Sequence, residues 1–257
     1  MAIKKQDDSK EINVLRITQS RLEVCILGVS PIILNRLSQK AQRELLMPKK
    51  KTAADKAANL KHNPFQEFRD SAYLSKDPKS PTVILVPATA FKSGMRNAAI
   101  DIPGSAAKAQ IGRLTYVEGD YINLYGVPKL HMAITRNSDM NRTPDVRTRV
   151  IVPQWACRIS VKYVTPVLKE SAVANLLAAA GMIQGVGDWR TEKGKGDYGQ
   201  FELCNEDDPR FVEIMKDGGR KQQQAAFDSP QCYDAETAEL LAWFSEEAKN
   251  RGFKAVG

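Results

Sequence analysis

The sequence contains few of the residue types that build metal centres, disulfide frameworks and membrane spans. Only two histidines and four cysteines occur among its 257 residues, and no two cysteines form a C-x-x-C pair. This scarcity argues against a structural zinc site and favours a reduced, cytoplasmic protein. No apolar run is long enough to cross a bilayer, and the charged start of the chain lacks the apolar stretch of a secretory signal. We therefore expect no metal, no cofactor and no membrane partner.

Aromatic residues are also scarce, at 7%, but the rest of the composition is ordinary, with 42% hydrophobic and 26% charged residues. Such a chain can build a folded core, which excludes the disordered, collagen-like and coiled-coil classes. The net charge of +8 is distributed unevenly. Basic residues concentrate in 36–61 and 136–162, whereas residues 200–257 carry 12 acidic and 7 basic side chains. Clustered positive charge favours a polyanionic partner, although a merely solvated surface has the same composition.

Apolar periodicity predicts the secondary structure. We expect an exposed, basic insertion with helical content at 35–81, and a long, basic and irregular connection at 126–153. Residues 113–117 and 121–125 are predicted to pair as a hairpin around Glu118-Gly119-Asp120. Further strands are predicted at 21–29, 83–86, 155–164 and 201–204, and helices at 90–100, 166–180 with a Gly181 cap, 209–217 and 234–250, the last burying Leu240, Leu241, Trp243 and Phe244.

Without its insertions, this order is β, α, β, β, α, β. It predicts an α+β fold with a ferredoxin-like, RRM-like core, in which two helices cover one face of an antiparallel sheet. Many RNA-binding modules use this architecture. We expect one domain, 1–257, with the basic insertion at 35–81, a second long segment at 119–154 and an acidic helical extension at 205–257.

A glycine-rich loop between the second helix and the last strand is the most distinctive segment. Its glycines allow close approach to a ligand, and its basic residues Arg190, Lys193 and Lys195 suit phosphate. The spacing fits neither a Walker loop nor a Rossmann fingerprint, and both of those motifs lead from a strand to a helix. Trp189, in the same loop, either packs on the core or stacks on a base. A flexible connection without a ligand is the alternative.

Two motifs resemble the RAMP superfamily: the stretch 86–96, VPATAFKSGMR, and the loop Gly185–Gly199 before the last strand. The element order and a long basic segment between the middle strands also match the backbone subunits of class 1 CRISPR effector complexes, and the fuller pattern resembles phage-encoded proteins. The resemblance implies a subunit that polymerises along a guide RNA, with 119–154 as its thumb-like segment. By position it assigns Lys92 and Arg96 to backbone phosphate and makes thumb residues of Arg142, Arg147 and Arg149. The loop carrying Trp189, Arg190, Lys193 and Lys195 would line the strand.

Catalytic members of this family cut target RNA with an aspartate in the loop after the first strand. Here that loop, residues 30–36, has no carboxylate and ends in Asn35 and Arg36, which we take as nucleic-acid contacts. We therefore expect a non-catalytic protein that coats RNA or single-stranded DNA as a homo-oligomer, with other CRISPR effector subunits as candidate partners. One alternative is an endoribonuclease using His62 or His131 as general base. Another is a phage-encoded mimic that joins or blocks a CRISPR complex through protein contacts.

Overall fold

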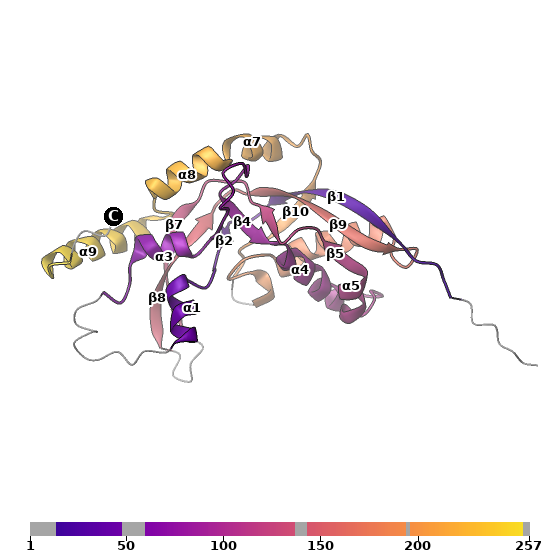
Figure 1. Cartoon of the computed structure of the whole chain (residues 1–257), viewed down its shortest axis with the longest axis horizontal. Helices are drawn as coiled ribbons and strands as arrows, with labels where there is room; N and C mark the ends of the chain where they lie inside the picture. Colours follow the sequence, from indigo (N-terminus) through magenta and orange to yellow (C-terminus); the bar gives the residue numbers. More distant parts are fainter. Residues whose placement is uncertain (1–13, 48–59, 137–142, 194–195, 254–257) are drawn as a thin grey trace, which may run out of the picture.

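The computed structural model describes residues 14–47, 60–136, 143–193 and 196–253. Figure 1 shows an elongated molecule in which strands from distant parts of the sequence meet at the centre. In chain order the elements are β1 (Thr18–Gly28), β2 (Ile32–Ile33), α1 (Gln39–Leu46), α3 (Pro64–Asp70), β3 (Tyr73–Leu74), β4 (Ile84–Pro87), α4 (Ala88–Asp101), α5 (Lys108–Leu114), β5 (Thr115–Val117), β6 (Tyr121–Asn123), β7 (Lys129–Arg136), β8 (Pro144–Val152), β9 (Ala156–Thr165), α6 (Glu170–Ala179), the π-helical turn η1 (Ala180–Gln184), the 3-10 turn η2 (Thr191–Lys193), β10 (Phe201–Cys204), α7 (Pro209–Asp217), α8 (Arg220–Asp228) and α9 (Ala235–Asn250).

The main sheet has the strand order β10-β1-β9-β5, and all of its pairs are antiparallel. Along the chain, β1, α4, β5, β9, α6 and β10 follow the predicted βαββαβ order, and this strand order is that of a ferredoxin-like sheet. The longest pairing joins β1 to β9, from Thr18 opposite Thr165 to Leu27 opposite Ala156. The predicted α+β fold and its core are therefore confirmed.

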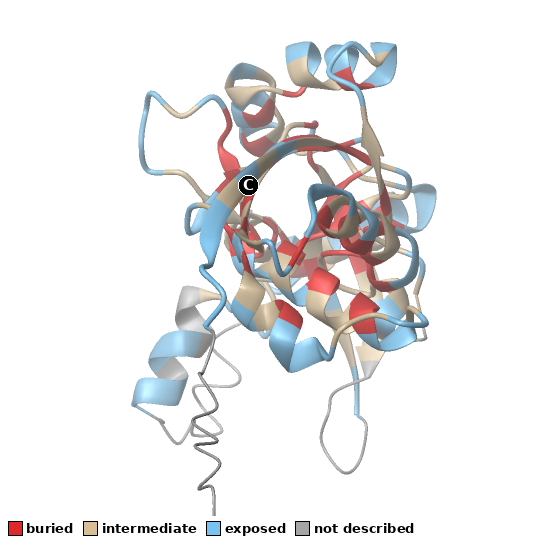
Figure 2. Ribbon diagram, turned by 90° about the vertical axis from the view of Figure 1, so that its right-hand side faces the viewer, coloured by how far each residue is buried: buried red, intermediate tan, exposed pale blue. Residues whose placement is uncertain are grey.

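Strand alternation decides which face of this sheet is buried. Ile26 of β1 and Ile159 and Val161 of β9 point to one face, where they pack with Phe91 and Met95 of α4 and with the apolar side of α6. In Figure 2 the buried residues, drawn red, lie where helices and strands face each other. The opposite face is covered at one end only, where Phe211 of α7 packs on Leu27 and Ala156.

The predicted hairpin between 113–117 and 121–125 is wrong. β5 pairs with β9, whereas β6 pairs with β4 in a separate sheet of order β3-β4-β6. The turn at Glu118-Gly119-Asp120 therefore carries the chain from one sheet to another. Its sequence permits a reversal, but the partners of the two strands lie far away along the chain.

We expected residues 126–153 to be irregular, but they contain a second antiparallel pair of strands. β7 and β8 align from Lys129 opposite Ile151 to Arg136 opposite Pro144, and β2 adds to the other side of β8. Alternating apolar residues, such as Leu130 and Val150, bury one face of this pair. This hairpin occupies the thumb-like segment, whose boundaries stay a prediction.

The expectation of an exposed insertion at 35–81 fails for its second half. Asn63 caps α3 by accepting a hydrogen bond from the Gln66 backbone N–H at 3.0 Å. This helix places Phe68 in the core, fully buried, with its ring centroid 5.2 Å from that of Phe227 in α8. The segment therefore contributes to the main core, because it supplies apolar side chains that the β7/β8 hairpin and α8 cover.

Two helix boundaries differ from the prediction. α6 begins at Glu170, four residues after Pro166, and it continues through η1 to Gly185, which has φ 68°. Gly181 is therefore not the cap. A Cβ at Gly181 would collide with the Phe201 backbone, so glycine there permits close packing of η1 on β10.

The C-terminal part contains three helices instead of two. The polar helix α8 was not predicted, and in α9 Trp243 lies 62% exposed on the side expected to be buried. α9 is held near β7 by Thr237, whose hydroxyl accepts from the Met132 backbone N–H at 3.3 Å. Leu240 and Leu241 pack against the core, but they are only partly buried.

Candidate nucleic-acid interface

The outward face of α4 combines cations with hydroxyl and amide groups. The stretch VPATAFKSGMR forms the end of β4 and the first turns of α4. Phe91 and Met95 are buried to 1% exposure or less, as predicted. Helical geometry places Lys92 and Arg96, both half-buried, on a different side of α4 from these two residues. Beside them lie the exposed side chains of Thr89 and Ser93 and the half-buried Asn97.

Lys92 and Arg96 form no ion pair with any described residue. The Lys92 Nζ lies 6.0 Å from the ring centroid of Tyr116, an exposed tyrosine on β5. Arg96 crosses Gly112 of α5, where a Cβ would lie 2.8 Å from its Cδ and Nε atoms, and its Nε is buried without a hydrogen-bond partner. Two cations and one accessible aromatic ring thus share the α4/β5 surface, a combination that suits a phosphate chain with exposed bases.

The glycine-rich loop packs against the loop that follows β1. The Asp188 backbone N–H donates to the Ile33 carbonyl at 2.8 Å, and that of Gly199 donates to the Pro31 carbonyl at 2.8 Å. Gly187 has φ 87°, and a Cβ there would lie 2.6 Å from the Ile33 oxygen. Glycine is therefore required for this close approach, and the loop has a defined course over its described residues.

A groove of about 220 Å³ separates this loop from α4. Arg190 lies in its wall, where its Nη1 donates to the Gly187 carbonyl at 2.9 Å and its Nη2 pairs with Glu192 at 2.6 Å. Glu192 also accepts from the Asn97 amide at 2.7 Å. The groove therefore offers donors from α4 and one arginine, which a single carboxylate neutralises. Its lining also includes Thr89, Ser93, Gln184 and Gly185.

A second cluster lies on the β7/β8 hairpin. Trp189 has φ 51° and is half-buried, with its ring centroid 6.3 Å from that of Tyr198. It packs close to Arg147, Arg149 and His131, and these side chains leave no space that a water molecule could enter. Arg149 forms a short ion pair with Asp188, and Arg147 pairs with Asp145 at 3.1 Å. The structure thus brings together three of the predicted site residues, with both arginines opposite carboxylates.

The remaining predicted site residues are dispersed. Asn35 is exposed, and the Arg36 guanidinium stacks 5.3 Å from the ring centroid of Tyr73. Lys193 is the last residue of η2, but its side chain is not among the described parts of the structure. Arg142 and Lys195 lie outside the described residues. Thr89, Ser93, Asn97, Tyr116 and Glu192 were missed. The spacing of the first three, at i, i+4 and i+8 beside Lys92 and Arg96, was the available signal.

The two histidines lie in different surroundings. His62 bridges Glu67, at 2.9 Å from Nδ1, and Asp145, at 3.1 Å from Nε2. The hydrogen bond that His62 donates to the Glu67 carboxylate is the main cause that raises the pKa of His62. His131 is buried, with Nδ1 3.5 Å from Asp234 and no hydrogen bond to either ring nitrogen, and burial lowers its pKa.

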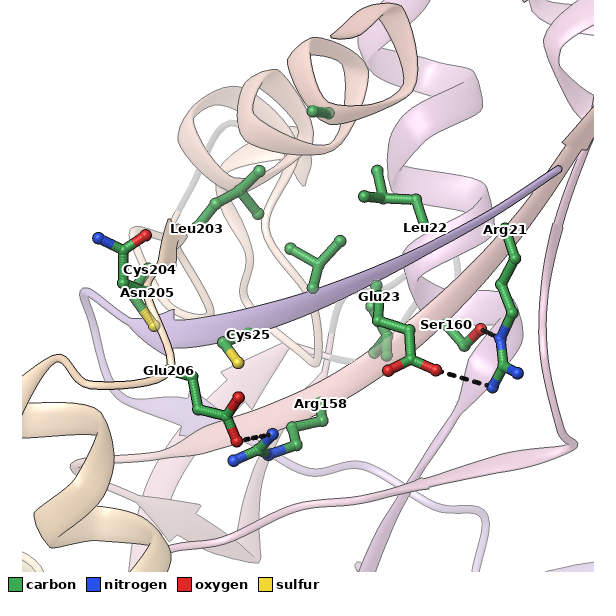
Figure 3. Close-up of a pocket in the computed structure, with 13 residues that line it drawn as sticks. Arg21, Leu22, Glu23, Cys25, Arg158, Ser160, Leu203, Cys204, Asn205 and Glu206 are labelled. Carbon is green, nitrogen blue, oxygen red and sulfur yellow. Dashed lines mark hydrogen bonds and ion pairs between the residues drawn. The ribbon is translucent and has the colours of Figure 1, made fainter. Parts of the chain in front are cut away.

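The uncovered face of the main sheet carries paired charges. Glu118 lies 2.8 Å from Arg21 and 2.7 Å from Lys162, and Arg158 lies 2.6 Å from Glu206. Figure 3 shows the Arg158–Glu206 pair beside the end of β10. Arg21 also pairs with Glu23 at 3.0 Å, so three cations on this face lie opposite three carboxylates and their charges balance. Tyr116 of the edge strand β5 aligns with Lys162 and supplies the exposed aromatic ring of this face among the described strands, at its border with Lys92 of α4.

Over the described ranges, no group of three or more histidine, cysteine, aspartate or glutamate residues is arranged to hold a metal ion. The same residues contain no helix that is both long and apolar enough to span a membrane.

No protein-family model matches the sequence, and no curated protein matches it. Among solved structures, the chain is similar to one in the Type III-B Cmr-beta complex bound to cognate target RNA, with TM-score 0.35, 14% identity and coverage of 73% of this chain and 59% of that one. It is also similar to Cmr6 from Pyrococcus furiosus, with TM-score 0.34, 10% identity and coverage of 73% and 99%. The chain thus spans 59% of the length of the first.

Proposed function

We propose that this protein binds a single-stranded nucleic acid, RNA or DNA, along the outward face of α4 and the glycine-rich loop. The observation that carries the proposal is the composition of this face. Lys92 and Arg96, which have no carboxylate partner among the described residues, lie beside the groove that contains Arg190. Cations at such a surface neutralise phosphates without reading bases.

The neighbouring groups suit a backbone that carries unstacked bases. Thr89, Ser93 and Asn97 can donate hydrogen bonds to phosphate or ribose oxygens. Tyr116, next to Lys92, offers a ring face on which a base can stack. Because every base has such a face, we expect binding with little sequence preference.

Titration of labelled oligonucleotides tests this proposal. Single-stranded RNA and DNA of mixed sequence should bind, a duplex of equal length should bind less tightly, and affinity should fall steeply as salt rises. An affinity that stays flat between low and moderate salt would exclude phosphate neutralisation as the mechanism. Comparison of the RNA and DNA affinities decides between these two ligands.

We further propose that copies of the chain assemble along the strand as subunits of a ribonucleoprotein complex, and that they do not cut it. The absence of a carboxylate from residues 30–36 supports the non-catalytic assignment. On long strands, particle size should grow with strand length. Particles that remain at one protein per strand at saturation would refute assembly, and binding to CRISPR subunits without nucleic acid would favour the mimic.

An endoribonuclease is the second candidate, favoured by the surroundings of His131. Its Nδ1 lies 3.5 Å from Asp234, and Arg147 and Arg149 lie close to its ring. Low affinity for a proton leaves the imidazole available as a general base. Incubation of labelled RNA with EDTA would reveal metal-independent cleavage, which His131→Ala should abolish and His62→Ala should leave intact.

A further inference from the structure

Among the described residues, no strand pairs with one edge of β1 over most of its length. β1 has 11 residues and β10 has 4, and β10 pairs only with Cys25 to Gly28. The Gly28 backbone N–H donates toward β9, to Trp155, whereas that of Val29 donates toward the β10 side, to Gln200. Backbone groups alternate along an antiparallel strand. The N–H and C=O groups of Arg21 and Glu23 therefore point to the free edge.

This free edge opens into a groove of about 510 Å³, drawn in Figure 3. One side of the groove is apolar, with Leu22, Val24 and Leu203 beside Ala174 of α6. The other side carries Arg21, Glu23, Arg158 and Glu206, and the two glutamates are 73% and 71% exposed. An unprotected edge with an apolar wall is a template for an added strand.

The segment immediately before β1 has the properties of such a strand. Residues 14–17 lie outside the helices and strands and form no hydrogen bond with any described residue, and Val14, Leu15 and Ile17 are 86%, 65% and 60% exposed. In an extended strand Leu15 and Ile17 share one face and Arg16 lies on the other. Seated in the groove, the two apolar side chains would face Leu22, Val24 and Leu203, and Arg16 would face Glu23 and Glu206.

The chain cannot place this segment on its own β1. Residues 14–17 lead directly into β1, whose first three residues, 18–20, pair with Val164 and its neighbours in β9. No turn is therefore available to bring residues 14–17 back beside Arg21. We infer that residues 14–17 of one copy add as a strand to the free β1 edge of the next copy. Each copy then has one donor strand and one acceptor edge, which gives a head-to-tail contact that does not close.

This inference rests on the assembly part of the proposed function, and it is tested without nucleic acid. Sedimentation velocity of nuclease-treated protein should show oligomers that lengthen with concentration. Leu15→Asp with Ile17→Asp removes the donor at exposed positions and should raise the dissociation constant more than tenfold. Glu23→Pro removes an N–H that points to the free edge and should block the acceptor. Glu23→Ala, which keeps that N–H, is the matched control and should still oligomerise.

Mixing the two defective variants is the decisive experiment. Each should be monomeric alone. The Leu15→Asp/Ile17→Asp variant lacks the donor strand but keeps its acceptor edge, whereas the Glu23→Pro variant lacks the acceptor edge but keeps its donor strand. The mixture should therefore form one-to-one dimers and nothing longer. A mixture that stays monomeric would overturn the inference. The inference would also be overturned if the Leu15→Asp/Ile17→Asp variant formed oligomers as large as those of the wild type, or if the wild type were a monomer. Symmetric pairing of two β1 edges predicts no rescue.

The outcome is separable from nucleic-acid binding. The monomeric Leu15→Asp/Ile17→Asp variant should bind short oligonucleotides with wild-type affinity, because its α4 face is intact. If the wild-type protein oligomerises through this contact but binds no oligonucleotide, the proposed ligand is refuted, whereas the proposed strand exchange between copies is supported.

Discussion

Replacing Lys92 and Arg96 together by alanine tests the α4 face most directly. Each phosphate contact with a single strand contributes about 0.7 to the slope of log affinity against log salt, so losing two contacts lowers the slope by about 1.4. The same relation gives binding weaker by about 25-fold at about 0.1 M salt and by about fivefold at about 0.3 M. The loss should be equal for all sequences, since neither cation reads a base.

The stability of this double variant should change little. The Lys92–Tyr116 contact, at 6.0 Å, is at an exposed ring, where such contacts contribute about 0.5–1 kcal/mol. Arg96 loses the packing of its stem on Gly112, but its buried Nε has no partner to lose. We expect a loss of about 1–2 kcal/mol in the free energy of unfolding.

Two control variants separate binding from folding. Lys216→Ala with Lys221→Ala removes the same charge from exposed positions on α7 and α8, away from α4 in Figure 1, and should leave the salt slope unchanged. Phe91→Ala should cost about 3–5 kcal/mol of stability and leave the slope of the folded fraction unchanged. If the Lys92/Arg96 variant melts like Phe91→Ala while binding with the wild-type slope, the basic face is structural and our reasoning is refuted.

Four further outcomes are expected. Glu192→Gln frees Arg190 from its ion pair and should tighten oligonucleotide binding by about fivefold, the equivalent of the roughly 1 kcal/mol of a good exposed pair; weaker binding would show that Glu192 positions the ligand. The folded pKa of His62 is raised above its ordinary value, so its two ion pairs stabilise the protein at low pH and the gain is lost as pH rises through that pKa. The melting temperature of wild type relative to His62→Gln should therefore fall between about pH 6 and pH 8, and a constant difference would contradict this. Gln223→Ala should lower the free energy of unfolding by about 3–5 kcal/mol, because Gln223 is fully buried and satisfies two backbone N–H groups and three carbonyls; an unchanged denaturation midpoint would count against that network. Arg158→Ala should leave oligonucleotide affinity unchanged, whereas a loss comparable to that at α4 would move the ligand to the open face of the sheet.

The βαββαβ core was predictable because its signals are local. The spacing of Phe91, Met95, Ala98 and Ala99 identifies the buried side of α4, and alternation identifies β9 and β10. Asp208 followed by Pro209 marks the start of α7, where the carboxylate accepts from the Arg210 N–H at 2.9 Å. Each of these signals lies within one element.

The errors concern contacts between distant segments. α8 reads RKQQQAAFD, a polar sequence without an apolar stripe, and its place is set by Gln223, whose amide binds the carbonyls of Leu124 and Gly126. β5 and β6 have hairpin-like sequences, but their partners β9 and β4 lie elsewhere in the chain. Register and partner choice depend on such non-local packing, which no short window contains.

For the candidate site, the sequence predicts which residues are basic but not which of them have excess charge. Arg147 and Arg149 were expected to bind nucleic acid from the family resemblance, and Arg190 from its place in the glycine-rich loop, yet each of them faces a carboxylate. Asp188 reaches Arg149 from a segment 39 positions away. A cation that already faces a carboxylate must exchange this partner for the ligand, so it contributes less to binding than an unpaired cation does. Because Arg147, Arg149 and Arg190 are paired with carboxylates, we expect them to contribute less to nucleic-acid binding than Lys92 and Arg96.

Charge balance also decides between the two faces of the main sheet. Ferredoxin-like modules that bind RNA on the open face stack bases on its aromatic side chains. Here Arg21, Lys162 and Arg158 already face Glu118 and Glu206, so a phosphate approaching this face meets carboxylates as well as cations. On the helical face, Lys92 and Arg96 have no such competitor among the described residues. A strand held there would run over α4 and past Arg190, and the free edge of β1 would remain available for the next copy of the chain.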